Sequence, residues 1–300
     1  MIPHAFDYHR ASSLEEASRL LGQLGEDAKV LAGGQSLIPL MKLRLARPSA
    51  LVDLNHIPRT SYIESQNGGL RIGAMTRHAA LEESSAAAEI PILHDCAAGI
   101  ADAQVRNMGT IGGSLAEADP HGDWAPVLIA LGAEVECIGP GGARMLPVAQ
   151  FIKDAFTTAL GSTDLVKEVR VPAAKERSAG AFTAFKRCAP VYPTASVAVQ
   201  VRMLDEDFCE DASVVLGCVG LKPIVVSEAA AALRGQAITP HAIERAAEAA
   251  MTAAEPQPDL RGSADYKRLL VRVLTRRALL AALARARGEY VEVSHEYVGR

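Results

Sequence analysis

The sequence predicts an α+β protein built from two main units, and three observations support this. Helical and strand-like segments are interspersed along the first half of the chain. A polar stretch with proline and glycine, residues 171–180, marks a boundary. Beyond it, three strand segments precede two helices. The 300 residues, 49% of them hydrophobic, suffice for two or three compact units.

In the N-terminal half, local signals place each element in turn. Ser12 or Ser13 caps a helix that continues to Leu24, because carboxylates follow in its first turn. A strand over residues 28–32 stops at Gly33 and Gly34, and helical spacing follows over 37–45 with Pro39 in the first turn. Further along we expect strands at 52–54, 70–73 and 133–138, a helix over 86–100 broken at Pro91, and a helix over 124–131 capped by Asp123 and ended by Gly132.

In the C-terminal half, alternation predicts strands over 181–188, 196–204 and 212–219. Thr239 and Pro240 open a helix that reaches Met251, and a long helix covers 265–287. On this last helix an apolar stripe is predicted at Leu270, Val273, Leu274, Ala278 and Ala281. Another face carries Arg268, Arg272 and Arg276; it is predicted to be solvated, although an anionic partner is an alternative.

Composition excludes several classes of protein. A net charge of -4 and a pI near 6.1 argue against a nucleic-acid binder, which needs clustered positive charge. The start of the chain does not resemble a signal peptide, and no apolar run is long enough to insert into a membrane. Five scattered cysteines indicate reduced thiols in a cytoplasmic protein and give no metal or iron–sulfur spacing.

The first pair of glycines, Gly33 and Gly34, lies between a strand and a helix. Such a turn presents unbonded backbone N–H groups, which attract anions, and glycine lets the backbone approach phosphate oxygens closely. A single pair would more often be a plain strand–helix turn. The pattern is neither a Walker loop nor a GxGxxG fingerprint.

A second pair, Gly112 and Gly113, favours a ligand site over a plain strand–helix turn. Two such loops can hold a pyrophosphate from both sides, and Asp119 or Asp123 can then accept hydrogen bonds from ribose hydroxyls. One alternative makes Asp119, His121 and Asp123 a metal site, but their spacing is not typical of zinc or calcium. Another leaves Asp123 as a helix cap, which is compatible with ribose contact.

These motifs resemble a known family. Residues 31–44 and 104–114 resemble the FAD-binding medium subunit of the molybdenum hydroxylases, which include carbon monoxide dehydrogenase and xanthine dehydrogenase. The resemblance covers nearly the whole chain, from residues 6–17 to residues 260–268, and the second of these segments resembles the family's C-terminal flavoprotein domain. Two long motifs in the right order make the resemblance specific.

The resemblance implies a PCMH-type FAD-binding fold like that of vanillyl-alcohol oxidase, followed by a C-terminal α+β domain with a three-stranded sheet and helices. It implies a FAD-binding domain over residues 1–174, with subdomains of about 1–55 and 56–174, then a second domain over 175–288 and a tail over 289–300. The implied FAD contacts are Leu31, Ala32, Gly33, Gly34, Gln35, Ser36, Leu37, Ile100, Thr110, Ile111, Gly112, Gly113, Ser114, Asp123, Leu160, Lys186 and Tyr192.

Some of these residues have a simpler explanation. Ile100 and Leu160 also fit a plain core, and Lys186 also fits a surface charge on a strand. Tyr192 either covers the flavin or gates access to it. Many relatives carry an aspartate where this chain has Val191, so the hydrogen bonding near Tyr192 differs.

The resemblance implies an oxidoreductase subunit whose reactive group is its FAD, and we expect neither catalytic side chains nor a metal on this chain. Partner subunits would carry molybdopterin and [2Fe–2S] clusters, and FAD would pass their electrons to an external acceptor. The expected assembly is a heterohexamer, a dimer of heterotrimers. The alternative is a self-sufficient FAD-dependent oxidoreductase with its own organic substrate.

Overall fold

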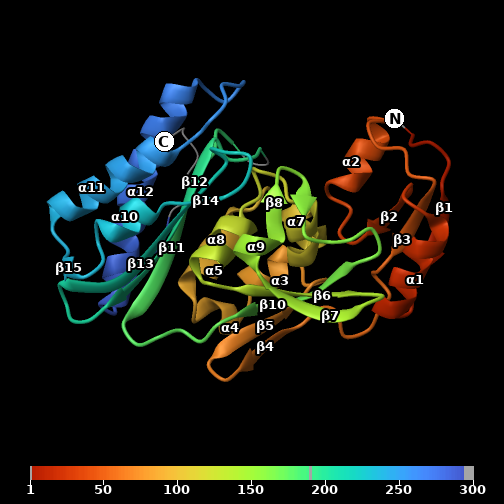
Figure 1. Cartoon of the computed structure of the whole chain (residues 1–300), viewed down its shortest axis with the longest axis horizontal. Helices are drawn as coiled ribbons and strands as arrows, with labels where there is room; N and C mark the ends of the chain where they lie inside the picture. The colour runs from red at the N-terminus through yellow and green to blue at the C-terminus, as the bar shows by residue number, and fades with distance from the viewer. Residues whose placement is uncertain (1, 189–190, 294–300) are drawn as a thin grey trace.

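The computed structural model describes residues 2–188 and 191–293, in which three main sheets follow one another along the longest axis of the molecule (Figure 1). The N-terminal elements lie at one end and the C-terminal helices at the other. Within the described ranges, no helix is both long and apolar enough to cross a bilayer.

A small parallel sheet with strand order β1-β3-β2 forms the N-terminal unit. Its elements are β1 (Asp7–Arg10), α1 (Leu14–Leu24), β2 (Ala28–Leu31), α2 (Leu37–Lys42) and β3 (Ala50–Asp53). The predicted cap is confirmed, because the Ser13 side chain accepts a hydrogen bond from the Glu16 N–H at 3.1 Å. Helix α2 is shorter than predicted: Arg44 has a φ of 62°, which ends the helix, and Leu45 is 75% exposed.

The central unit is an antiparallel sheet with strand order β4-β5-β10-β6-β7, covered by short helices. Its strands are β4 (Ile63–Gln66), β5 (Gly69–Gly73), β6 (Glu134–Gly139), β7 (Gly142–Pro147) and β10 (Leu165–Val171), with a small β8 (Ile152–Asp154) and β9 (Thr157–Thr158) pair. Its helices are α3 (His78–Glu82), α4 (Ser85–Ala88), α5 (Pro91–Gly99), α6 (Ala103–Met108), α7 (Ile111–Glu117), α8 (Trp124–Ala130) and α9 (Val148–Phe151). The predicted break at Pro91 and the helix end at Gly132 are confirmed.

The C-terminal unit is an antiparallel sheet with helices on one face. Its elements are β11 (Ser178–Phe185), β12 (Ala195–Met203), β13 (Phe208–Gly217), β14 (Ile224–Val225), α10 (Ser227–Ala231), β15 (Gln236–Ala237), α11 (Pro240–Ala253) and α12 (Ala264–Ala286). The three predicted strands are its long strands, and β14 and β15 both pair with β13. These two additions were missed because a two-residue strand has no detectable alternation.

The apolar stripe predicted on α12 is partly wrong. Val273 is 44% exposed, and Val271 is buried in its place with Leu274 and Ala278. The arginine face is exposed but paired, since Arg272 and Arg276 both form ion pairs with Glu244 of α11. Of the predicted tail, residues 289–293 form no helix or strand, and residues 294–300 lie outside the described residues.

The C-terminal sheet has two buried faces, and this arrangement positions the site. Val197, Val199 and Val201 of β12, whose alternation predicted a strand, pack toward α11 and α12. On the opposite face, Phe182 and Ala198 join the core of the central unit. Helices α5 and α8 contact this face, so the sheet is firmly packed against the central unit.

Candidate functional site

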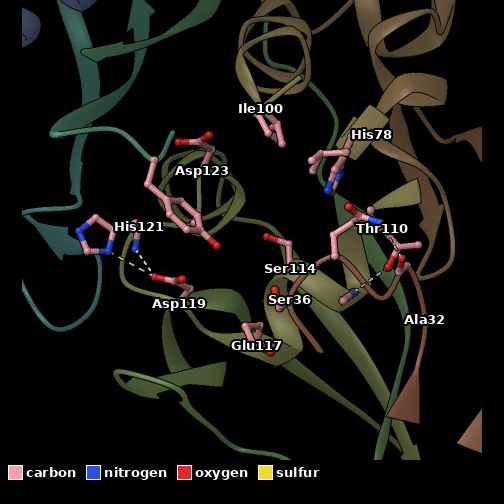
Figure 2. A pocket seen from close by; sticks show the side chains of 18 of the residues that line it. Ala32, Ser36, His78, Ile100, Thr110, Ser114, Glu117, Asp119, His121 and Asp123 are labelled. Carbon is pink, nitrogen blue, oxygen red and sulfur yellow. Dashed lines mark hydrogen bonds and ion pairs between the residues drawn. The ribbon is translucent and has the colours of Figure 1, made fainter. Parts of the chain in front are cut away.

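A pocket of about 350 Å³ lies where the three units meet (Figure 2). Its wall combines the β2–α2 loop, the ends of α5 and α6, the start of α7, the α7–α8 loop and the segment after β11. It is lined by Val30, Ala32, Gly33, Gly34, Gln35, Ser36, Leu37, His78, Ile100, Ala101, Val105, Gly109, Thr110, Gly113, Ser114, Glu117, Asp119, His121, Gly122, Asp123, Lys186, Val191, Tyr192 and Pro193. Most of the residues predicted to bind FAD are therefore brought together.

The first glycine loop fits the prediction of an anion-binding turn. Gly34 has a φ of 71°, a conformation that side chains disfavour. Within the described ranges, the backbone N–H groups of Gly34, Gln35 and Ser36 donate to no protein acceptor. The loop therefore presents a row of available donors at the pocket wall.

The second glycine loop is built differently from the first. Its glycines lie inside α7, because Thr110 caps that helix by accepting a hydrogen bond from the Gly113 N–H at 3.1 Å. The N–H of Gly112 bonds to the Ala74 carbonyl, and a Cβ on Gly112 would lie 2.5 Å from the Ala74 Cβ. The expectation of available N–H groups thus fails here, and the loop contributes the small Gly113 and the Ser114 side chain to the pocket.

The two loops touch, as their predicted joint role requires. A Cβ on Gly33 would lie 2.3 Å from the Met108 carbonyl oxygen and 2.8 Å from the Gly109 Cα. Residue 33 must therefore be glycine for the loops to come this close. The two segments form adjacent walls of one pocket.

Asp123 and Lys186 form a buried ion pair at the pocket. Asp123 does not cap α8 as predicted, because its own backbone is helical and it makes no capping bond. Its Oδ2 lies 3.3 Å from the Lys186 Nζ, and Lys186 also donates to the Gly99 carbonyl. Both side chains are at most 7% exposed, so the reading of Lys186 as a surface charge is wrong.

Asp119, His121 and Tyr192 form a polar cluster at another wall. Asp119 Oδ1 accepts the His121 backbone N–H at 2.9 Å, and the rings of His121 and Tyr192 lie 5.8 Å apart. Burial would raise the pKa of Asp119, but hydrogen bonds from His121 and Tyr192 lower it. Burial and the charges of Asp119 and Glu117 raise the pKa of Tyr192, so its hydroxyl stays protonated at neutral pH.

The metal alternative finds no support in this geometry. Asp123 faces Lys186, while Asp119 binds His121. In the part of the chain that the structure describes, these three side chains form no group that could hold a metal ion.

Four predicted residues do not line the pocket. Ile111 is fully buried in the central core, and Leu160 packs against that core. Gly112 packs against Ala74. Leu31 is the last residue of β2 and precedes the first pair of glycines. For Ile111 and Leu160 the placement is that of core residues.

His78 lines the pocket and was missed. Its Nδ1 accepts a hydrogen bond from the Trp124 indole at 3.0 Å, and both residues are buried. Burial, followed by the charges of Arg77 and Arg106, lowers the pKa of His78 to about 4. No local signal marks this histidine, because its partner lies 46 residues away.

Comparisons with known proteins identify both parts of the chain. Residues 4–174 match the model of the FAD binding domain in molybdopterin dehydrogenase, and residues 180–282 match that of the CO dehydrogenase flavoprotein C-terminal domain. The first match alone spans more than half of the chain.

Individual relatives are similar over their full length. The carbon monoxide dehydrogenase medium chain of Afipia carboxidovorans is 40% identical over 96% of this chain and 100% of its own. The alpha subunit of the 6-hydroxypseudooxynicotine dehydrogenase complex of Paenarthrobacter nicotinovorans is 38% identical over 98% of this chain and 100% of its own. In a solved structure of carbon monoxide dehydrogenase from Hydrogenophaga pseudoflava, a chain superposes with a TM-score of 0.92 at 41% identity, covering 95% of this chain and 99% of that one. The chain therefore belongs to the FAD-binding medium subunits of the carbon monoxide dehydrogenase-type molybdenum hydroxylases, which are oxidoreductase complexes.

Proposed function

We propose that this chain holds FAD in the pocket between its three units and relays electrons from [2Fe–2S] clusters on a partner subunit to an external acceptor. The observation that carries the proposal is the first glycine loop, whose N–H groups line the pocket and donate to no acceptor among the described residues, in a chain from a FAD-binding family. FAD supplies the electron-transfer chemistry when bound, and the chain supplies its position and surroundings.

The residues of the pocket fit a flavin dinucleotide. A pyrophosphate needs N–H donors and small residues that allow close approach, and residues 33–36 with Gly113 and Ser114 supply both. A ribose needs a carboxylate acceptor, and Asp123 lies at the wall with its charge balanced by Lys186. An isoalloxazine ring needs apolar or aromatic faces, for which Ile100 and Tyr192 are available.

On this basis we assign roles to the predicted residues. Of residues 31–37 and 110–114, those that line the pocket surround the pyrophosphate, while Asp123 binds ribose and Ile100 and Tyr192 contact the flavin. Lys186 acts through Asp123. Leu31, Ile111, Gly112 and Leu160 contribute by packing behind the wall.

We further propose that residues 1–174 and 175–288 are separate domains, the first with subdomains of about 1–55 and 56–174. The ranges matched by the two family models support this division. The assembly would contain a molybdopterin-binding large subunit and a [2Fe–2S] small subunit, as a dimer of heterotrimers. The described cysteines are all unpaired thiols, which favours the reducing cytoplasm.

One observation favours a second candidate function. The cluster of Asp119, His121 and Tyr192 places titratable groups in the pocket, as an enzyme acting on its own organic substrate would require. Purification of the tagged full chain from its native source separates the two functions. Co-elution of equimolar large and small polypeptides with molybdenum and iron supports the relay. A lone chain that reduces its flavin with an organic substrate would overturn it.

A further inference from the structure

His78 occupies a wall of the pocket for which no role has been described. Figure 2 shows its imidazole between Ile100 and Thr110, across the pocket from Asp119 and His121. The residue is only 5% exposed, and it begins α3. Its backbone N–H bonds to the Gly109 carbonyl at 3.1 Å, so its position is fixed relative to the second glycine loop.

The Trp124 indole determines which imidazole nitrogen carries the proton. An indole N–H is a donor only, so the Nδ1 of His78 must accept, and the proton of the neutral ring must reside on Nε2. Because the pKa of His78 is lowered to about 4, the ring is neutral at physiological pH. The Nε2–H is therefore a permanent donor.

This donor has no acceptor in the described parts of the chain, residues 2–188 and 191–293. A Cβ on Gly109 would lie 2.7 Å from Nε2, which places the nitrogen directly over a residue with no side chain to cover it. Nε2 is not among the fully buried polar atoms that lack a partner in the described residues, so it is accessible from the pocket, where an acceptor oxygen of a ligand can replace water.

We propose that the Nε2–H of His78 donates a hydrogen bond to an oxygen of the bound flavin nucleotide, with Trp124 as the residue that positions and orients it. The proposal rests on the proposed FAD site. Two neighbours support a ligand on this side: Ile100 and Thr110 line the same wall, and the first glycine loop adjoins Gly109. The charges of Asp123 and Lys186 already balance each other at the pocket, and the neutral Nε2–H adds no further charge. An uncharged donor therefore suits a cofactor oxygen there.

The test uses the flavin-free full chain and titration of FAD, followed by quenching of flavin fluorescence. His78→Phe keeps the ring volume and removes the donor, and we expect FAD affinity to fall about 5- to 15-fold. His78→Gln places an amide N–H near the Nε2 position and should recover most of the affinity. Trp124→Phe should weaken binding about 3- to 10-fold, because the ring is no longer held in one tautomer. His94→Phe, at an exposed site on α5 outside the pocket, is the control and should bind normally.

A second readout follows the proton itself. Nitrogen chemical shifts of His78 should report the Nε2–H tautomer from pH 5.5 to 8, and the Nε2 shift should change when FAD is added. Wild-type FAD affinity in His78→Phe would show that the donor role is wrong. The same conclusion follows if both variants unfold at the wild-type temperature and His78→Gln binds FAD no better than His78→Phe. Failure of the wild type to bind FAD would instead contradict the proposed function.

Discussion

The Lys186 Nζ lies 3.3 Å from Asp123 Oδ2, and this contact joins the C-terminal unit to the pocket wall. Lys186 directly follows β11, whereas Asp123 directly precedes α8 of the central unit. Lys186 also donates to the Gly99 carbonyl at the end of α5, next to Ile100. The pocket therefore extends beyond the 1–174 segment, and the C-terminal unit completes it.

The first prediction concerns this ion pair. In Lys186→Met the buried Asp123 carboxylate loses its contact with the Lys186 ammonium, which disturbs its placement at the pocket wall. We expect FAD to bind at least about 10-fold more weakly, measured by fluorescence titration. Arg268→Met removes a partner of Asp265, whose side chain is 91% exposed, and should leave affinity unchanged. Wild-type affinity in Lys186→Met would show that the pair plays no part in cofactor binding.

The second prediction concerns the contact between the glycine loops. Gly33→Ala would place a Cβ 2.3 Å from the Met108 carbonyl oxygen, so the loops must separate. We expect this variant to lose FAD on gel filtration while keeping its circular dichroism spectrum. Gly141→Ala is the matched control, because nothing lies within 4 Å of its Cβ position. Full flavin retention by Gly33→Ala would count against the pyrophosphate assignment.

The third prediction concerns the packing of the C-terminal unit on α5. Arg285 contacts both carboxylate oxygens of Asp95, at 2.6 and 2.9 Å, and both side chains are at most 8% exposed. Arg285→Met leaves Asp95 buried without its cation and should lower the free energy of unfolding by about 3–5 kcal/mol in urea denaturation.

A neighbouring arginine provides the control for this experiment. Arg287 pairs with Asp207, whose side chain is 81% exposed, so Arg287→Met should change stability by less than about 1 kcal/mol. Equal stabilities for the two variants would contradict a structural role for the Arg285–Asp95 pair.

The fourth prediction concerns acid stability. Burial would raise the pKa of Glu168, but hydrogen bonds from Arg71, Tyr62 and Arg170 lower it to about 2. Because the folded pKa lies below the unfolded value of 4.5, this carboxylate stabilises the fold above pH 4.5. That stabilisation is lost as pH falls from 4.5 toward 2.

Melting temperatures of Glu168→Gln measured from pH 7 to pH 2.5 test this. The variant should be less stable at pH 7 and should decline less steeply in acid than the wild type. Glu64→Gln, at a 57% exposed partner of Arg71, should keep the wild-type slope. An unchanged acid slope in Glu168→Gln would refute the role given to this carboxylate.

Elements with local signals could be predicted from the sequence. Ser13 and Thr239 cap helices as expected, since a capping side chain bonds to an N–H three residues on. Pro91 starts a helix and Gly132 ends one. The first glycine loop also has the positive φ predicted for it, because glycine at position 34 adopts that conformation readily.

Features that depend on distant contacts could not be predicted in this way. Position 112 needs a glycine because it packs closely against Ala74. Asp123 was predicted to cap the adjacent helix, but it faces Lys186, which lies 63 residues further along the chain. The pairing of His78 with Trp124 is likewise a tertiary contact. In each case the residue type was visible, but its partner was determined by the tertiary packing of segments far apart in the sequence.

The central claim is that FAD binds in the pocket where the three units meet. The most direct test adds FAD to the flavin-free full-length chain, removes unbound cofactor by gel filtration and records the visible absorbance. We predict an equimolar flavin content for the wild type and Gly141→Ala, and little flavin for Gly33→Ala and Lys186→Met. A wild-type chain that stays colourless, or undiminished flavin in both pocket variants, would contradict the claim.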